Sequence, residues 1–177
     1  RSQGDGSAAL AQYERALRVN PAFADAYIQS GGIYQERGDL ARAEALYNEA
    51  LAAAVTDARS RASALTRLGN LEALAGQTDR AIARYQEAQQ EDPGFAGSYI
   101  QLGQVYLTQE QWDLALEQFQ AAVQSAPGSS EARFFLGQIY SRLGQLDQAE
   151  AELAEVIRLT PGSMRAYLWL GRVYTTR

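Results

Sequence analysis

The amino-acid sequence predicts an all-α fold of stacked antiparallel helix pairs, on three observations. The first is a series of glycines at intervals of 38, 34, 34 and 34 residues: Gly31, Gly69, Gly103, Gly137 and Gly171. The second is that similar residues surround these glycines, and a repeat near 34 residues with this content is typical of stacked helical hairpins. The third is composition, because abundant alanine, only 4 prolines and short β-branched runs favour helices over strands.

Each repeat begins with a predicted helix whose core side chains share one face. With each glycine taken as the eighth position, the repeat that starts at residue 96 has Tyr99, Leu102, Gly103 and Tyr106 at positions four, seven, eight and eleven. Spacings of three and four residues place these side chains on one stripe of a helix. We expect the glycine to let a second helix approach closely, rather than to cradle a phosphate, since no strand precedes it.

A second helix follows in each repeat and ends before a proline. In the same repeat its core stripe is Ala115, Phe119 and Ala122. A proline then closes the helix, because it lacks the amide that a continuing helix needs. The prolines that hold this place are Pro21, Pro93, Pro127 and Pro161. Glycine in three of the turns between paired helices suits the left-handed residue that follows a helix.

The repeat positions predict a single array over residues 1–177. It consists of the second helix of a leading partial repeat (7–19), complete repeats at 24–57, 58–95, 96–129 and 130–163, and the first helix of a trailing repeat (164–177). The 38-residue interval places four extra residues within 52–61, where Val55 stands instead of a proline. Four residues are about one helical turn. Either the helix that starts near Asp57 is one turn longer, or the surface loop is enlarged.

These repeats resemble the tetratricopeptide repeat family over essentially the whole chain. The resemblance rests on the glycine at position eight, tyrosine at eleven, alanines at twenty and twenty-seven, and the closing proline. It departs from the family pattern at Arg133 (position four), at Glu72 (position eleven) and at Val55. The resemblance implies a right-handed superhelical solenoid whose concave face is lined by the first helices and binds an extended or helical peptide.

Helical geometry selects candidate binding residues that point away from the core stripe, at positions two, five, nine and twelve. Position nine carries amides in three successive repeats, which could bind the backbone of a peptide or simply occupy a polar face. Position five is largely apolar, and it either offers an exposed strip for anchoring side chains or is buried between neighbouring first helices. The predicted peptide-binding residues are Ile28, Gln35, Thr66, Asn70, Ile100, Gln104, Leu107, Phe134, Gln138, Arg142, Arg165, Leu168 and Arg172.

Charges are uneven along the predicted groove. The first repeat contributes Asp25 and Glu36, and the last repeats contribute Arg142, Arg165 and Arg172. This gradient would direct the acidic end of a partner toward the C-terminal repeats, or it serves solubility alone.

Composition argues against catalysis and cofactor binding. The chain has no Cys and no His, and all 16 basic residues are Arg, which removes thiolate, imidazole and amine chemistry and the common zinc ligands. Glu150, Glu152 and Glu155 fall on a second helix and are interpreted as a solvated face. The net charge of −5 disfavours nucleic-acid binding, and no apolar run approaches the roughly 20 residues that span a bilayer. We therefore expect no catalytic residue, metal ion, cofactor, nucleic acid or direct membrane insertion.

The leading hypothesis is a non-enzymatic interaction scaffold of bacterial origin that holds a protein or peptide in its concave groove. One alternative is an accessory domain cut from a larger enzyme or from a secretion, pilus or envelope-assembly protein. Another is a homo-oligomeric scaffold that assembles through open ends, because Tyr167, Leu170 and Tyr174 would be only partly covered on an unpaired last helix. The lack of Cys fits the cytoplasm and the periplasm alike.

Overall fold

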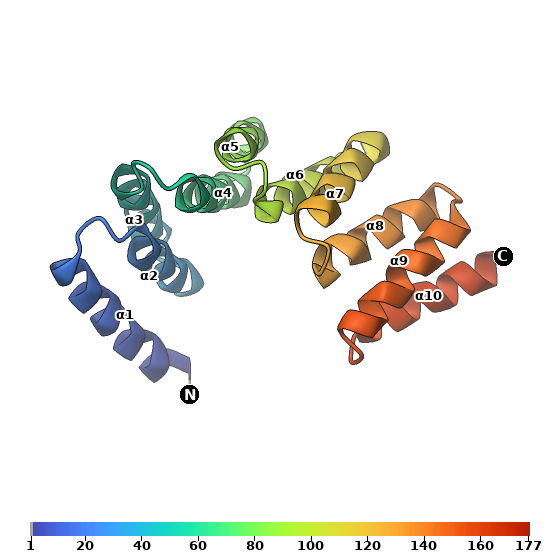
Figure 1. Cartoon of the computed structure of the whole chain (residues 1–177), viewed down its shortest axis with the longest axis horizontal. Coiled ribbons are helices and arrows are strands. Elements are labelled where there is room, and N and C mark those ends of the chain that lie inside the picture. The colour runs from blue at the N-terminus through green and yellow to red at the C-terminus, as the bar shows by residue number, and fades with distance from the viewer. Residues whose placement is uncertain (1) are drawn as a thin grey trace. The chain divides into compact units, whose positions relative to one another are not determined.

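A computed structural model describes residues 2–177, and the side chains from Gly6 onward (Figure 1). The described residues form ten α-helices and no strand, which confirms the predicted all-α fold. The first helices of the repeats are α2 (Ala24–Glu36), α4 (Ala58–Leu74), α6 (Ala96–Thr108), α8 (Ser130–Arg142) and α10 (Met164–Thr176). The second helices are α1 (Ser2–Val19), α3 (Leu40–Ala53), α5 (Thr78–Glu91), α7 (Trp112–Ser125) and α9 (Leu146–Leu159). None of the helices in the described part of the chain is long and apolar enough to cross a membrane.

The chain divides into two compact units. Unit 1 ends at Ser98, and unit 2 covers Tyr99–Arg177. In unit 1, α2 pairs with α3 and α4 pairs with α5, while α1 packs against α2 and α3 against α4. Figure 1 shows α3 and α5 lying on one side of α2 and α4. In unit 2, α7 packs against α8, α8 pairs with α9, and α9 packs against α10.

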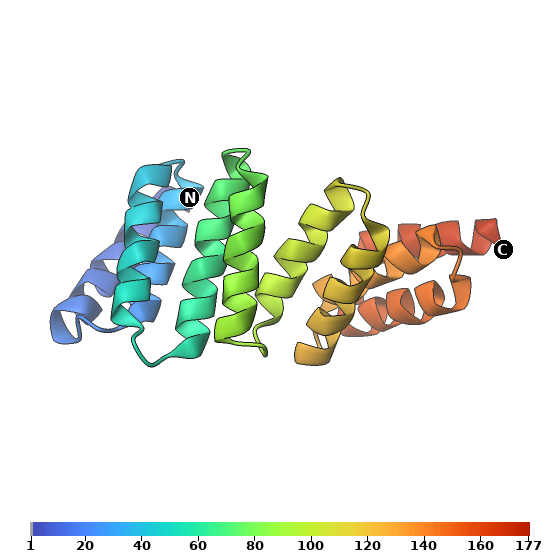
Figure 2. The same ribbon diagram turned by 90° about the horizontal axis from the view of Figure 1, so that it is seen from above.

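The first helices of neighbouring hairpins contact each other directly within each unit. Helix α2 contacts α4 in unit 1, and α8 contacts α10 in unit 2. Figure 2 shows the two helices of each hairpin side by side and joined by a tight turn. This contact between first helices decides which of their side chains remain accessible.

Four of the regularly spaced glycines are points of close helix contact, as the sequence predicts. A Cβ added to Gly31 would lie 2.5 Å from Cε1 of Tyr47, a ring that comes from the second helix of the same hairpin. The same position of the next hairpins places Tyr85 on Gly69, Phe119 on Gly103 and Leu153 on Gly137. Only glycine leaves room for these side chains without displacing them.

The turns between paired helices use a left-handed residue in each case that the structure describes. Gly38, Gly76 and Gly144 have φ values of 78°, 74° and 72°. In the hairpin of α6 and α7 the corresponding residue is Glu110, with φ of 57°. A side chain at positive φ is unfavourable, so this turn carries backbone strain that the glycine-containing turns avoid.

The longer interval between Gly31 and Gly69 is accommodated by an extra helical turn. Helix α4 has 17 residues, whereas α2 and α8 have 13. Its N-terminus is capped by Asp57, whose carboxylate accepts hydrogen bonds from the backbone N–H groups of Arg59 and Ser60 and from the Ser60 hydroxyl. These hydrogen bonds, above all that from the Ser60 hydroxyl, lower the pKa of Asp57. The cap explains why the extra residues are helical rather than an enlarged loop.

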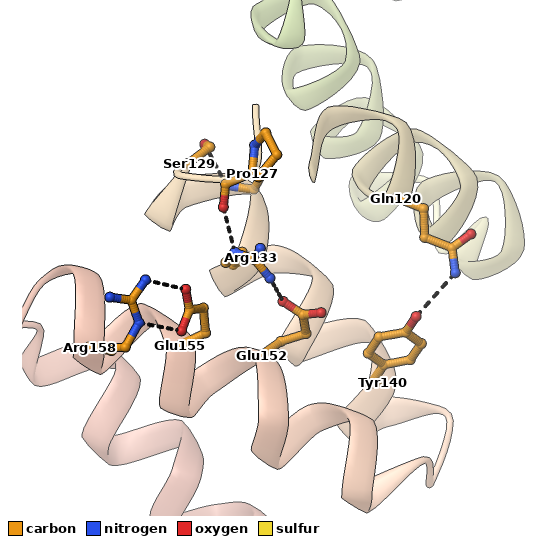
Figure 3. A network of polar contacts seen from close by, with 9 residues as sticks. Gln120, Pro127, Ser129, Arg133, Tyr140, Glu152, Glu155 and Arg158 are labelled. Atoms are coloured by element: carbon orange, nitrogen blue, oxygen red, sulfur yellow. Dashed lines mark hydrogen bonds and ion pairs between the residues drawn. The ribbon is translucent and has the colours of Figure 1, made fainter. Parts of the chain in front are cut away.

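Arg133 and Glu72, the charged residues that depart from the family pattern at positions four and eleven, each lie close to a side chain of opposite charge. Arg133 lies on α8 and donates hydrogen bonds to Glu152 of α9, at 2.7 Å, and to the carbonyl oxygen of Pro127, at 2.8 Å (Figure 3). In unit 1, one carboxylate oxygen of Glu72 lies 3.6 Å from Nε of Arg84. Each pair joins the first and second helix of one hairpin, so an ionic contact replaces the apolar one.

Candidate functional site

The candidate site comprises the first helices, and its residues divide between the two units. Unit 1 holds four of them: Ile28, Gln35, Thr66 and Asn70. Unit 2 holds the others: Ile100, Gln104, Leu107, Phe134, Gln138, Arg142, Arg165, Leu168 and Arg172.

The apolar residues at position five do not form an exposed strip. Ile28, Ile100 and Phe134 are only 3%, 6% and 5% exposed, and Thr66 is buried with its hydroxyl donating to the Ala62 carbonyl. Ile28 clusters with Ala64 of α4, Ile100 with Ala132 of α8, and Phe134 with Ala166 of α10, so the expectation of an exposed strip is wrong for these three and burial between helices is correct. Leu168, on the last helix, is 65% exposed.

Leu107 is also partly withdrawn from the surface. It is half-buried and packs against the apolar cluster around Phe119 and Ile139. It contributes to the core of unit 2 more than to an open face.

Two amide side chains of unit 1 are held in place by buried tyrosines. The Tyr47 hydroxyl donates to Oε1 of Gln35 at 2.8 Å, and the Tyr85 hydroxyl donates to Oδ1 of Asn70 at 2.9 Å. Each ring lies on a helical glycine, so its hydroxyl reaches past the first helix to the amide. The amide oxygen is then occupied, and the amide N–H₂ group is left as a donor for a ligand.

Burial keeps both phenols protonated. Burial, together with the smaller effect of the negative charge of Glu72, raises the pKa of Tyr85 to about 12. Burial also raises the pKa of Tyr47, although the nearby Arg67 opposes this effect. Both hydroxyls therefore act as hydrogen-bond donors at neutral pH, with a positioning role for the amides.

A groove in unit 1 has a volume of about 470 Å³. A Cβ added to Gly32, which lines this groove, would meet no atom within 4 Å among the described residues. Glu36 and Arg67 give its wall both signs of charge. The full lining is Tyr13, Ile28, Gln29, Gly32, Ile33, Gln35, Glu36, Arg67 and Leu74.

A second groove, in unit 2, has a volume of about 500 Å³. It brings together three predicted residues, Gln104, Phe134 and Arg165. Nε2 of Gln104 lies 3.4 Å from a carboxylate oxygen of Glu131, which is a long hydrogen bond. The remaining lining residues are Ser130, Phe135, Val156, Thr160 and Ser163.

The three predicted arginines of unit 2 stack on aromatic rings. The guanidinium of Arg165 lies 4.3 Å from the ring centre of Phe134. Arg142 and Arg172 lie 4.9 Å and 5.0 Å from the rings of Trp112 and Trp169. All three remain exposed. Stacking restrains the guanidinium groups while leaving their N–H donors available to an anion.

The structure adds residues that the choice of helix positions did not include. Tyr13 and Arg67 line the groove of unit 1, and Trp112 supports Arg142 in unit 2. Arg67 lies at position six, which a selection of positions two, five, nine and twelve omits. Tyr13 comes from a second helix, and its spacing from Pro21, equal to that from Phe119 to Pro127, could have revealed its position in the array.

Among the residues that the structure describes, no group of three or more His, Cys, Asp or Glu side chains is arranged to hold a metal ion.

Two family models match the chain. The model described as Tetratricopeptide repeat matches residues 1–68. The model described as Cilia and flagella-associated protein 70 C-terminal domain matches residues 50–176. A search of curated protein sequences finds no match.

Solved structures with 18–24% sequence identity share the fold. YrrB, described as a TPR protein with an unusual peptide-binding site, is 24% identical with a TM-score of 0.60, over 94% of this chain and 84% of that chain. The first TPR of Spaghetti (RPAP3), bound to the HSP90 peptide SRMEEVD, is 21% identical with a TM-score of 0.63, over 67% of this chain and 94% of that chain. BtubC from P. vanneervenii is 18% identical with a TM-score of 0.75, over 97% of this chain and 81% of that chain.

Proposed function

The chain belongs to the tetratricopeptide repeat family and, within it, to the family of the Cilia and flagella-associated protein 70 C-terminal domain, and on this premise we propose that it is a non-enzymatic scaffold that binds an acidic peptide segment of a partner protein. The observation that carries the proposal is the groove of unit 2, with Arg165 held on the ring of Phe134 at its edge.

The chemistry of this groove supports an acidic ligand. Arg165 presents a restrained guanidinium with free N–H donors, which match a carboxylate in a two-pronged geometry. Gln104 and Ser130 supply neutral donors and acceptors for a peptide backbone. The groove also contains Glu131, which would disfavour a second carboxylate beside it and so limit where acidic side chains bind.

The similar structures support a peptide as the class of ligand. The peptide bound to the RPAP3 domain, SRMEEVD, contains acidic residues, so an acidic peptide has a precedent on this fold. YrrB is likewise described by its peptide-binding site. The partner is therefore a segment that can lie extended over the first helices, rather than a small molecule.

The test is selection of binders from a displayed library of random peptides about 12 residues long, followed by affinity measurement on the recovered sequences. We expect acidic binders whose affinity falls with added salt, because exposed charge pairs are screened. Arg165→Ala should weaken them by about tenfold, the loss expected for one charged contact at an interface.

Arg158→Ala is the matched control, because Arg158 is an exposed arginine of α9 that pairs with Glu155 of its own helix. Arg158→Ala should change the affinity for the peptides by no more than about twofold, because a surface ion pair far from the groove contributes little. Two results would contradict the proposal. One is an equal loss of peptide affinity in Arg165→Ala and Arg158→Ala, and the other is the recovery of peptides without acidic residues whose affinity Arg165→Ala leaves unchanged.

A further inference from the structure

One of the five repeat glycines lacks the contact that the other four make. A side chain of a second helix lies on Gly31, Gly69, Gly103 and Gly137. A Cβ added to Gly171 of α10 would meet nothing within 4 Å among the described side chains. The position that Tyr47 or Phe119 occupies in an inner hairpin is therefore open on α10.

The surface around Gly171 is apolar and exposed. Tyr167 and Tyr174, which lie at positions four and eleven of this helix, are each 51% exposed. In the α8–α9 hairpin the corresponding residues, Arg133 and Tyr140, are partly buried. Helix α10 thus presents the face that a first helix normally turns toward its partner. The Tyr174 hydroxyl donates a hydrogen bond to Glu150 of α9, but about half of each tyrosine stays exposed.

Helix α1 carries the complementary surface. Its Ala9, Tyr13 and Ala16 have the spacing of the inner triads, such as Ala43, Tyr47 and Ala50. Those inner triads are fully buried against a first helix, whereas Ala9, Tyr13 and Ala16 are only half-buried. Helix α1 is therefore a second helix whose small-residue face is only partly covered by the described residues.

We propose that α1 of a second copy packs on α10, with the Tyr13 ring on Gly171, and completes a hairpin between two chains. The contact repeats an arrangement that the chain already makes, in which an aromatic ring of a second helix lies on a helical glycine, as Tyr47 lies on Gly31 and Tyr85 on Gly69. It buries two half-exposed tyrosines of α10 and the small-residue face of α1, which favours association through apolar burial.

This contact joins different surfaces of the two copies and so does not close by two-fold symmetry. Each added chain leaves one α1 and one α10 uncovered, and the assembly grows with concentration. The surface is distinct from the groove of the proposed peptide ligand, so either function can fail without the other.

The test uses one variant for each end. Gly171→Leu fills the open position on α10, and it is compatible with folding because no neighbour lies within 4 Å. Tyr13→Asp removes the ring on α1 and places a charge in the contact. Gly128→Leu is the control, since a Cβ added to Gly128 also meets nothing within 4 Å among the described residues, but Gly128 lies between α7 and α8.

Sedimentation velocity across concentrations should show wild type and Gly128→Leu growing beyond a dimer. Gly171→Leu alone and Tyr13→Asp alone should each weaken self-association by about tenfold or more, the effect expected when an aromatic contact at the centre of an interface is lost. An equimolar mixture of Gly171→Leu and Tyr13→Asp should form a dimer and stop there, because only one functional α1 and one functional α10 remain in each pair. Circular dichroism confirms that each variant is folded.

Three results would overturn the inference. Wild type that stays monomeric would mean that a second copy does not cover α10. Wild type that stops at a dimer unaffected by Tyr13→Asp would mean that α10 pairs with itself. A mixture of the two end variants that stays monomeric, with both folded, would mean that α1 and α10 are not the paired surfaces.

Discussion

Individual residues of this chain matter mainly through size and burial. Gly31 and Gly32 are adjacent on α2, yet one is covered by Tyr47 and the other faces the groove of unit 1. The identical amino acid is required at one position and replaceable at the next. This contrast offers a direct measurement of the cost of helix contact.

We predict that Gly31→Ala destabilises the protein by about 1–3 kcal/mol, the range for overpacking a close contact. Gly32→Ala should instead stabilise it by about 0.5–1 kcal/mol, because alanine favours the helix and meets no neighbour. Urea denaturation of both variants measures the difference. Similar urea midpoints for the two variants would show that the Tyr47 ring moves away from the added methyl group at little cost in free energy.

Tyr85 predicts a pH dependence of stability. Burial, with the charge of Glu72, raises the pKa of Tyr85 to about 12, whereas an unfolded tyrosine titrates near pH 10. The raised pKa means that its contribution to stability is complete below pH 10 and is lost as the pH rises toward 12. Tyr85→Phe removes the hydrogen bond to Asn70 and should cost about 1 kcal/mol at pH 7.

The measurement is chemical denaturation of both proteins from pH 7 to 11.5. The advantage of wild type over Tyr85→Phe should shrink above pH 10. A constant difference across this range would mean that the Tyr85 hydroxyl does not titrate with a raised pKa.

At the scale of elements, the hairpins are alike in their turns with one exception. Gly38, Gly76 and Gly144 adopt positive φ at no steric cost, but Glu110 adopts it with a side chain. The α6–α7 hairpin therefore folds despite its turn residue, through the contact of Phe119 with Gly103 and the cluster around it.

Glu110→Gly should stabilise the protein by about 1 kcal/mol, the usual cost of a left-handed conformation for a residue other than glycine. A thermal midpoint higher than that of wild type is the expected result. Glu110→Ala serves as the control: it removes the charge without relieving the backbone and should change the midpoint little. A similar gain in both variants would assign the effect to charge.

At the scale of the whole molecule, each helix packs mainly against its neighbours in the chain. Stability in such an array is approximately a sum of repeat and nearest-neighbour contributions. A local defect should therefore weaken nearby hairpins more than distant ones, with a graded rather than an all-or-none response.

We predict that Gly31→Ala lowers the hydrogen-exchange protection of α2 and α3, while α8 and α9 keep that of wild type. Hydrogen exchange read by mass spectrometry resolves the two regions. A uniform loss of protection across the described helices would mean that the protein opens as one cooperative unit.

The sequence alone determined the helix pairs, their order and the packing role of the glycines. These depend on residue size and on a period that is visible in the chain, because a ring can approach a helix closely only at Gly31 or its equivalents. The sequence also indicated that Tyr167 and Tyr174 lie on an uncovered face, which the structure confirms for both.

The tertiary structure alone decided which candidate binding residues remain accessible. Ile28 and Leu168 share position five, yet one is 3% and the other 65% exposed, because burial depends on whether a neighbouring first helix contacts that face. The reach of the Tyr85 hydroxyl to Asn70 depends likewise on the distance between helices. Helix periodicity specifies the direction of a side chain, whereas only the packed neighbours determine what that side chain meets.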